Sequence, residues 1–335
     1  MCEGTLRLMD VFPDTWPAQF QKYQKARSDA HIYAHNHGYY EPHSITPIYA
    51  DGAMAFGMID DLGYIGVGTG NSAQNDLLVF GDSFAYGYGV NSSKTFAARL
   101  HAYNAGVWGE AFPFHSTVFQ RVVSVVKPKR AIWVLYPPHL ISCTPGGWNT
   151  RKTINPTKYP IYAFLVEQFN KTKCSTLILK ATGWGYNRED YYSLEWSLYD
   201  GSDDRIEAGY SSFENAVTAV QTTAKERGVQ IVALFVPSKT QIALELSNAR
   251  PLLYRRGPLD ANLATNRMES ILEKHGISRD CQINLMELIR QTPEKWESYY
   301  FKTDAHFNET GSAAIAEFIA MRLKGNPLRD GEKVR

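Results

Sequence analysis

Three short stretches of the chain hold residue types that together could carry out acyl transfer. Ser83 stands in "LLVFGDSFAYGYGV" (77–90), directly after four apolar residues and a Gly-Asp pair. Asp304 and His306 stand in "TDAHFNETG", just ahead of a C-terminal apolar-periodic segment. A serine hydroxyl becomes a strong nucleophile when a histidine takes its proton, and a carboxylate commonly orients that histidine. The residues therefore predict a Ser-His-Asp nucleophilic site.

Each motif has a simpler structural explanation when it is taken alone. Gly-Asp-Ser after a strand is also a common turn in which Asp82 or Ser83 caps the next helix. An Asp two residues before a His in a loop is more often a surface pair than a catalytic one. The prediction depends on the conjunction, because both motifs follow predicted strands or precede the last helix. Asp82 itself is expected to be a structural hydrogen-bond acceptor in the turn.

Alternating apolar runs and amphipathic segments predict the elements that position these residues. Short apolar runs predict strands at 76–80, 103–111, 131–137, 229–237 and 281–288. Segments with helical spacing predict helices at 92–100, 112–126, 212–228, 260–276 and 308–323. This alternation predicts an α/β fold with a mostly parallel sheet covered on both faces. In such sheets, ligands bind beyond the carboxyl ends of the strands, where Ser83 is expected.

The domain organisation follows from where this alternation holds. Residues 1–75 predict an N-terminal extension of short strands and loops packed on the core. Residues 76–325 form the predicted main domain, with an insertion at about 142–210 that is rich in turns and aromatic residues, and 326–335 form a tail. Within the insertion, Trp184, Tyr186 and Trp196 stand among polar residues and are candidates for stacking against a sugar ring. Burial of these aromatics against the sheet is the simpler alternative.

Composition excludes several other classes of protein. The chain has 335 residues with a formal net charge of +1 and no basic run, so nucleic acid is not an expected partner. The four cysteines are scattered without metal-binding spacing, and we expect no metal or other cofactor. No apolar run approaches the roughly 18 residues that span a bilayer. The first residues lack a signal-peptide pattern, which predicts a soluble chain, while its compartment and oligomeric state stay open.

The motifs resemble the blocks of the SGNH or GDSL hydrolases, which are esterases and acyl hydrolases with a flavodoxin-like three-layer α/β/α sandwich. "LLVFGDSFAYGYGV" resembles the first block, which implies that Ser83 is the nucleophile and that its N–H contributes to the oxyanion hole. "YNAGVWGEAF" resembles the second block, which implies that the Gly109 N–H is another donor. "TDAHFNETG" resembles the last block, which implies Asp304 as the acid and His306 as the base.

The sequence departs from this family in its third block. The family places an asparagine there as a third oxyanion donor, but this chain reads "LYPPHLIS", with Pro138 or His139 at that place. A ring N–H of His139 is a candidate replacement. Asp-x-His is one residue shorter than the common family spacing and, with "FVPSK", is similar to SGNH proteins of polysaccharide O-acetylation, including alginate O-acetylation.

The resemblance therefore implies a serine-dependent hydrolase of acyl esters, with a carbohydrate-linked acyl group or a small ester as substrate. The departures leave two alternatives open. One is a polysaccharide O-acetyltransferase. The other is a carbohydrate-binding protein that keeps the SGNH fold with impaired chemistry.

Overall fold

The computed structural model describes residues 34, 37, 39–50, 53–65, 76–144, 196–247, 258–302 and 304–325. Its centre is a five-stranded parallel sheet in the order β4-β3-β5-β6-β7. The strands of this sheet are β3 (Leu77–Gly81), β4 (Tyr103–Gly106), β5 (Arg130–Leu135), β6 (Gln230–Phe235) and β7 (Gln282–Asn284). The α/β prediction with a parallel sheet is confirmed, and the strand order is that of a flavodoxin-like doubly wound sheet.

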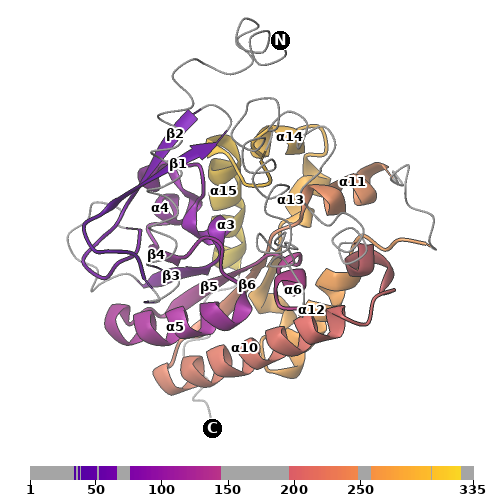
Figure 1. Ribbon diagram of the computed structural model, residues 1–335, viewed down its shortest axis with the longest axis horizontal. Helices are drawn as coiled ribbons and strands as arrows, with labels where there is room; N and C mark the ends of the chain where they lie inside the picture. The colour runs from indigo at the N-terminus through magenta and orange to yellow at the C-terminus, as the bar shows by residue number, and fades with distance from the viewer. Residues whose placement is uncertain are drawn as a thin grey trace, which may run out of the picture.

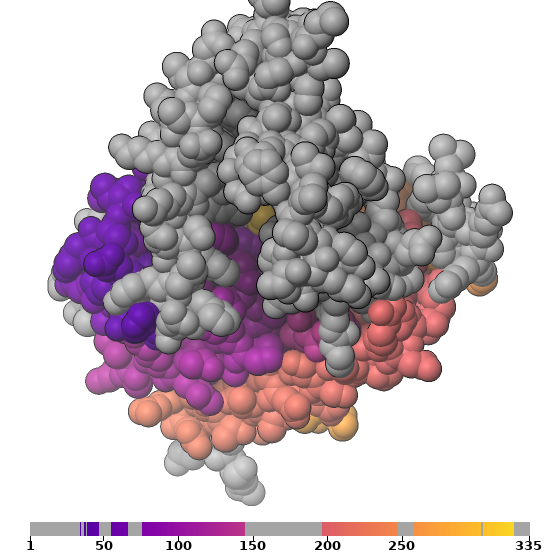
Figure 2. All heavy atoms as spheres, viewed as in Figure 1, coloured from indigo at the N-terminus to yellow at the C-terminus, as the bar shows by residue number. Residues whose placement is uncertain are grey.

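Helices cover both faces of this sheet. In Figure 1, α5 (Phe112–Val126) and α10 (Ile206–Arg227) lie below the strands, while α4 (Phe96–Arg99) and α15 (Glu309–Gly325) lie above them. Figure 2 shows α5 and α10 as adjoining magenta and salmon surfaces in the lower half of the molecule. The shorter helical elements are α3 (Ser83–Tyr86), η2 (Ser92–Lys94), α6 (His139–Ser142), α11 (Lys239–Ser247), α12 (Leu263–Lys274), η3 (Arg279–Cys281), α13 (Met286–Gln291) and α14 (Trp296–Tyr299).

Side chains that alternate along each strand build two separate hydrophobic cores. Phe80 and Trp133 point to the side of α5 and α10, where their rings stack with centroids 5.7 Å apart. Val79 and Val134 belong to the core under α15 and α4, together with Ile319. Parallel strands buried on both faces are nearly continuous apolar runs, which is why these segments were recognisable in the sequence.

Two further features correct or extend the predicted elements. The predicted strand at 281–288 is wrong beyond Asn284, because the Asn284 side chain accepts the backbone N–H of Met286 and starts helix α13. The short strands expected before residue 75 are present as an antiparallel hairpin of β1 (Ile45–Ala50) and β2 (Ala53–Met58). The division into extension, domain, insertion and tail stays a prediction, and most of the predicted insertion lies outside the described residues.

The strand order places a crevice at a defined point. The chain passes from β3 outward to β4 and then returns to β5 on the other side of β3. Connections that leave neighbouring strands in opposite directions open a crevice at the carboxyl edge, and ligands of such sheets bind there. Residues directly after β3 and β5 therefore face each other across this switch point.

Candidate active site

Ser83 lies at the carboxyl end of β3 as the first residue of the four-residue helix α3. Gly81 precedes this turn with φ of 140°, and a Cβ there would lie 2.8 Å from the Val134 carbonyl oxygen. Only glycine fits such an approach, so the nucleophile turn depends on it. The Asp82 carboxylate accepts the Phe84 N–H at 2.8 Å and caps α3, as expected for a structural acceptor.

His306 reaches Ser83 from the other end of the chain. Its Nε2 lies 2.6 Å from Ser83 Oγ, and its Nδ1 lies 2.5 Å from Asp304 Oδ1. The same carboxylate oxygen also accepts the His306 backbone N–H at 2.9 Å. The structure thus brings together the three residues that the sequence predicts as nucleophile, base and acid, with hydrogen-bond distances between them.

Aromatic rings hold the imidazole in this position. The His306 ring packs against Phe84 and Tyr88, with centroids 4.7 and 4.5 Å away. Its loop is fixed by backbone pairing of Tyr300 with Phe307. The Asn308 amide donates to the carbonyl oxygens of Ser298 and Tyr300 at 2.8 and 2.9 Å. These contacts restrict the imidazole, so it has less rotamer entropy to lose when it binds a proton or substrate.

The charge state of Asp304 follows from its neighbours. Burial alone would raise the pKa of its carboxyl, but the hydrogen bond and charge of His306 outweigh burial and lower it. Lys239 contributes to the lowering from a greater distance. The Lys239 Nζ itself donates to the Phe301 carbonyl at 2.5 Å and so ties α11 to the loop of His306. An ionised Asp304 is the form that can orient an imidazole and stabilise an imidazolium.

Gly109 and His139 stand at the turns after β4 and β5. Gly109 is exposed, with φ of 85°, and its neighbour Trp108 has its ring centroid 6.2 Å from that of Tyr88. His139 is the first residue of α6, and its Nδ1 lies 3.3 Å from Asp82 Oδ2. Pro138 and His139 were the two residues considered for the position of the family's third-block asparagine. Of these, His139 is the one whose side chain contacts Asp82, next to Ser83. The oxyanion roles of Ser83, Gly109 and His139 stay predictions.

The remaining candidates from the sequence lie elsewhere. Trp196 is partly buried and packs against the core, with its ring centroid 6.0 Å from Tyr199. Trp184 and Tyr186 lie outside the described residues. A role of these three aromatics in substrate binding stays a prediction.

Sequence reasoning missed a set of residues behind the site. Tyr40 accepts the Trp108 N–H at 3.1 Å through its hydroxyl, so the N-terminal extension supports the turn of Gly109. Burial raises the pKa of Tyr40 well above its ordinary value, which keeps it a neutral phenol. His115 lies buried near His139, with ring centroids 6.4 Å apart, and accepts the Trp133 indole N–H at 3.1 Å. No local motif marks these residues, since they come from segments that pair only in three dimensions.

The described residues also bear on metal sites and membrane-spanning helices. Within them, no group of three or more His, Cys, Asp or Glu side chains is arranged to hold a metal ion. Among these same residues, no helix has the length and apolar character needed to cross a membrane.

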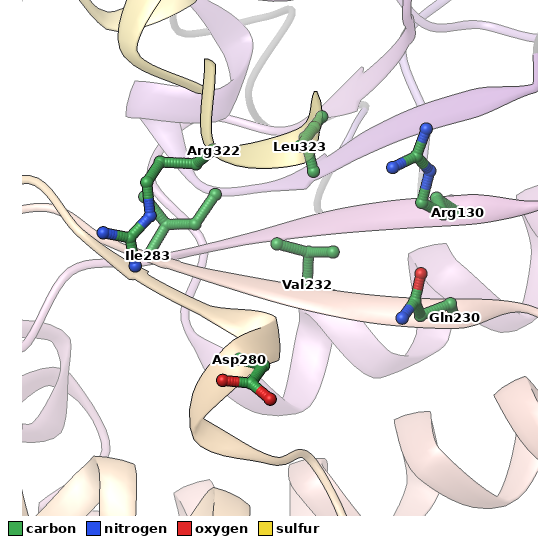
Figure 3. Close-up of a pocket in the computed structure, with 7 residues that line it drawn as sticks. All are labelled: Arg130, Gln230, Val232, Asp280, Ile283, Arg322 and Leu323. Carbon is green, nitrogen blue, oxygen red and sulfur yellow. The ribbon is translucent and has the colours of Figure 1, made fainter. Parts of the chain in front are cut away.

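The pocket in Figure 3 is lined in part by Arg130 and Gln230, the first residues of β5 and β6. It therefore lies at the amino edge of the sheet, opposite to Ser83.

Comparisons with known proteins identify a family for part of the chain. Residues 194–334 match the model of the SGNH hydrolase-like domain of acetyltransferase AlgX, a span that includes Asp304 and His306 and begins after Ser83. No protein among the curated sequences matches the chain.

Solved structures with a similar arrangement include hydrolases. A putative lipolytic protein of the G-D-S-L family from Desulfitobacterium hafniense DCB-2 is 13% identical, with a TM-score of 0.41, covering 74% of this chain and all of that one. TesA is 10% identical, with a TM-score of 0.41, covering 74% of this chain and 98% of its own. The hydrolase LAE5 from the metagenome of Lake Arreo, Spain, is 14% identical, with a TM-score of 0.40, covering 75% and 95%.

An independent family model supports the SGNH resemblance over the span that holds the last sequence block, with Asp304 and His306. Residues 194–334 are thus similar to the SGNH hydrolase-like domain of an acetyltransferase, which agrees with the SGNH resemblance of the sequence motifs.

Proposed function

We propose that the protein is a serine-dependent acyl ester hydrolase that works through an acyl-enzyme on Ser83. The observation that carries the proposal is the 2.6 Å distance between Ser83 Oγ and His306 Nε2. A nucleophile and its base at this distance, with a carboxylate on the other ring nitrogen, are the arrangement that acyl transfer requires. The alternative of a capped turn explains Asp82 but not a histidine brought from 223 residues away.

The mechanism follows from the roles of these groups. His306 Nε2 takes the Ser83 proton while Oγ attacks the ester carbonyl carbon. Asp304 accepts the N–H of Nδ1, which leaves Nε2 with the lone pair that a base needs. The oxyanion forms beside the N–H groups of Ser83 and Gly109, with His139 as a third donor. His306 then returns the proton to the leaving alcohol, and water resolves the acyl-enzyme.

A second candidate concerns the acceptor of the acyl group. The match of residues 194–334 to a domain of an acetyltransferase favours transfer of an acetyl group to a polysaccharide hydroxyl. Both reactions share the first half, and they differ only in whether water or a sugar hydroxyl attacks the acyl-enzyme. In both, the proposed substrate is a carbohydrate-linked acyl ester, and no metal or organic cofactor is needed.

The experiment compares Ser83→Ala with Ser270→Ala, an exposed serine on α12 that serves as the matched control. Wild type and Ser270→Ala are expected to turn over p-nitrophenyl acetate, while Ser83→Ala should lose at least about 10³-fold in rate. A fluorophosphonate probe should label only the proteins that keep Ser83. Equal rates in all three proteins would refute the proposal.

An added oligosaccharide acceptor separates the two candidates. Acetyl transfer to the acceptor that outruns hydrolysis would favour the transferase, and unchanged release of free acetate would favour the hydrolase. Tight glycan binding without fluorophosphonate labelling would instead support a carbohydrate-binding protein with impaired chemistry.

A further inference from the structure

A second Asp–His pair lies behind the nucleophile. Asp82 Oδ2 and His139 Nδ1 are 3.3 Å apart, and both atoms are enclosed. Their contact is not aligned as a hydrogen bond, and within the described part of the chain neither atom has another hydrogen-bond partner. The Asp82 side chain has no exposed area, while that of His139 keeps 11%. Because Nδ1 is enclosed, the exposed part of the imidazole is another edge of the ring.

Two enclosed atoms with lone pairs cannot face each other at this distance without a proton between them, because their partial charges would repel and both would stay unsatisfied. We propose that Asp82 and His139 always keep one proton between them across this contact, and that a second proton on the pair decides whether His139 Nε2 is a hydrogen-bond donor or an acceptor. Asp82 is then a positioning residue for the oxyanion donor. This inference rests on the proposed function for its catalytic consequence, but not for the proton itself.

The pair has two states that differ by one proton. In the protonated state, the Asp82 carboxyl O–H donates to Nδ1, and the ring carries its own N–H on Nε2, where it is a donor. When the proton leaves to solvent, the carboxylate draws the ring N–H to Nδ1, and Nε2 becomes an acceptor. An acceptor beside a developing oxyanion repels it, so only the protonated state completes the oxyanion hole.

The surroundings favour loss of this proton near neutral pH. Burial raises the pKa of Asp82 to about 7, although the backbone N–H groups of α3 lower it in part. Burial, together with the nearby His115 and His306, lowers the pKa of His139 to about 3. The ring therefore stays neutral while the carboxyl titrates. Below pH about 7 His139 Nε2 donates, and this ability is lost as the pH rises.

Three other titratable groups around the pair come from separate parts of the fold. His115 on α5 is neutral, since burial lowers its pKa to about 4, and its tautomer is fixed because its Nδ1 accepts from Trp133. Its Nε2–H then donates to the Glu110 carbonyl oxygen at 3.2 Å. The Tyr136 ring, after β5, lies edge-on to His139 at 5.4 Å. His306 faces the pair from the loop before α15.

Asp82→Asn tests the proposal with little structural change. The amide oxygen keeps the cap on Phe84, and the amide N–H replaces the carboxyl proton toward Nδ1. In protein labelled with ¹⁵N-histidine, His139 should change from the Nε2–H to the Nδ1–H tautomer between pH 5.5 and 8.5. His139→Gln assigns the resonances. In Asp82→Asn, His139 should keep the Nε2–H tautomer throughout. A His139 tautomer that ignores pH and is the same in both proteins would overturn the proposal.

A kinetic measurement tests the consequence for catalysis. The acylation rate is measured at pH 8.5 and at pH 6, and the ratio of the first rate to the second is compared between proteins. This ratio should be at least about tenfold higher in Asp82→Asn than in wild type, because wild type loses the His139 donor at pH 8.5. Asp76→Asn, an exposed carboxylate paired with Lys129, is the matched control and should keep the wild-type ratio. An equal ratio in Asp82→Asn would refute the catalytic part. Absence of any Ser83 acylation would refute the proposed function alone, because the tautomer measurement needs no turnover.

Discussion

Two Asp–His pairs flank the same serine, and they differ in nearly every physical property. Asp304 and His306 lie 2.5 Å apart with side chains 33% and 18% exposed, and their hydrogen bond is aligned. Asp82 and His139 lie 3.3 Å apart with side chains 0% and 11% exposed, and their contact is unaligned. In the first pair the carboxyl pKa is lowered, and in the second it is raised to about 7.

The difference shows that residue type alone does not set the role of an Asp–His pair. Partial exposure and an aligned imidazole keep Asp304 ionised, so it can orient a base. Complete burial makes the charged form of Asp82 costly, so it holds a proton near neutrality. Different environments shift the pKa values of two Asp carboxyl groups in opposite directions. One site can therefore hold both a carboxylate and a carboxylic acid. The predictions below separate the two pairs, from the largest effect to the smallest.

Removing the charge of Asp304 should have the largest effect. Asp304→Asn is expected to lower kcat on p-nitrophenyl acetate by about 10⁴-fold, because an amide can hold His306 in the wrong tautomer. Asp82→Asn, the same change in the other pair, should lose far less at pH 6. Steady-state kinetics of the two variants checks this order. Equal losses would mean that the two pairs do not have separate roles.

Removing the ring of His139 should cost less than removing the acid. His139→Leu is expected to lower kcat by about 10²- to 10³-fold, the loss of one oxyanion donor. His139→Asn, which places the family's amide there, should recover part of that loss. His275→Gln, at the end of α12, is a control for a histidine outside the site and should keep the wild-type kcat. A His139→Leu enzyme with full activity would exclude this residue from the oxyanion hole.

The two carboxyl groups should affect stability in opposite directions. The folded-state pKa of Asp82 is raised, so between pH about 4 and 7 the folded state binds more protons than the unfolded state, and stability falls as the pH rises. Asp82→Asn should therefore be more stable than wild type at pH 8. The pKa of Asp304 is lowered, so its ionised form stabilises the fold above its unfolded pKa, and Asp304→Asn should be less stable. Urea unfolding at pH 5 and 8 measures both, and shifts of the same sign would contradict the assignment.

The smallest expected effect concerns Lys239. Its positive charge contributes to the lowered pKa of Asp304, so Lys239→Met should raise that pKa and move the acid limb of the activity profile to higher pH. Lys239→Arg keeps the charge and should leave the limb in place. The pH dependence of kcat for the three proteins tests this. An acid limb that does not move in Lys239→Met would show that the charge of Lys239 does not act on Asp304 in this way.

The sequence predicted the parallel sheet well because buried strands such as 76–80 and 131–137 are continuous apolar runs. Helix α5 was predicted with its observed bounds, since its apolar residues recur at helical spacing. The end of β7 was missed because the Asn284 side chain accepts the N–H of Met286, the first residue of α13, and the apolar residues that follow do not reveal this turn. Helices α11, α13 and α14 were also missed, as they are short and depend on packing.

The site was predictable to the extent that motifs are local. Ser83, Asp304 and His306 carry sequence signals, and the structure places all three in contact. The contact of Asp82 with His139 has no such signal, because it exists only when β3 and β5 become neighbours in the sheet. Tyr40 was missed for a similar reason, since its segment shows neither the helical nor the strand periodicity of apolar residues.

The 223-residue separation of Ser83 from His306 has a consequence for folding of the chain. Closing so long a loop costs entropy before any contact compensates, and contacts of this kind form late. On the ribosome, β3 and its serine emerge long before the loop that carries the imidazole. Docking of α15, whose Glu309 pairs with Lys94 near the nucleophile turn, is the step that delivers the base. Under the proposed mechanism, a nascent chain holds an unactivated serine until its C-terminal helix packs, and acyl transfer begins only with the completed fold.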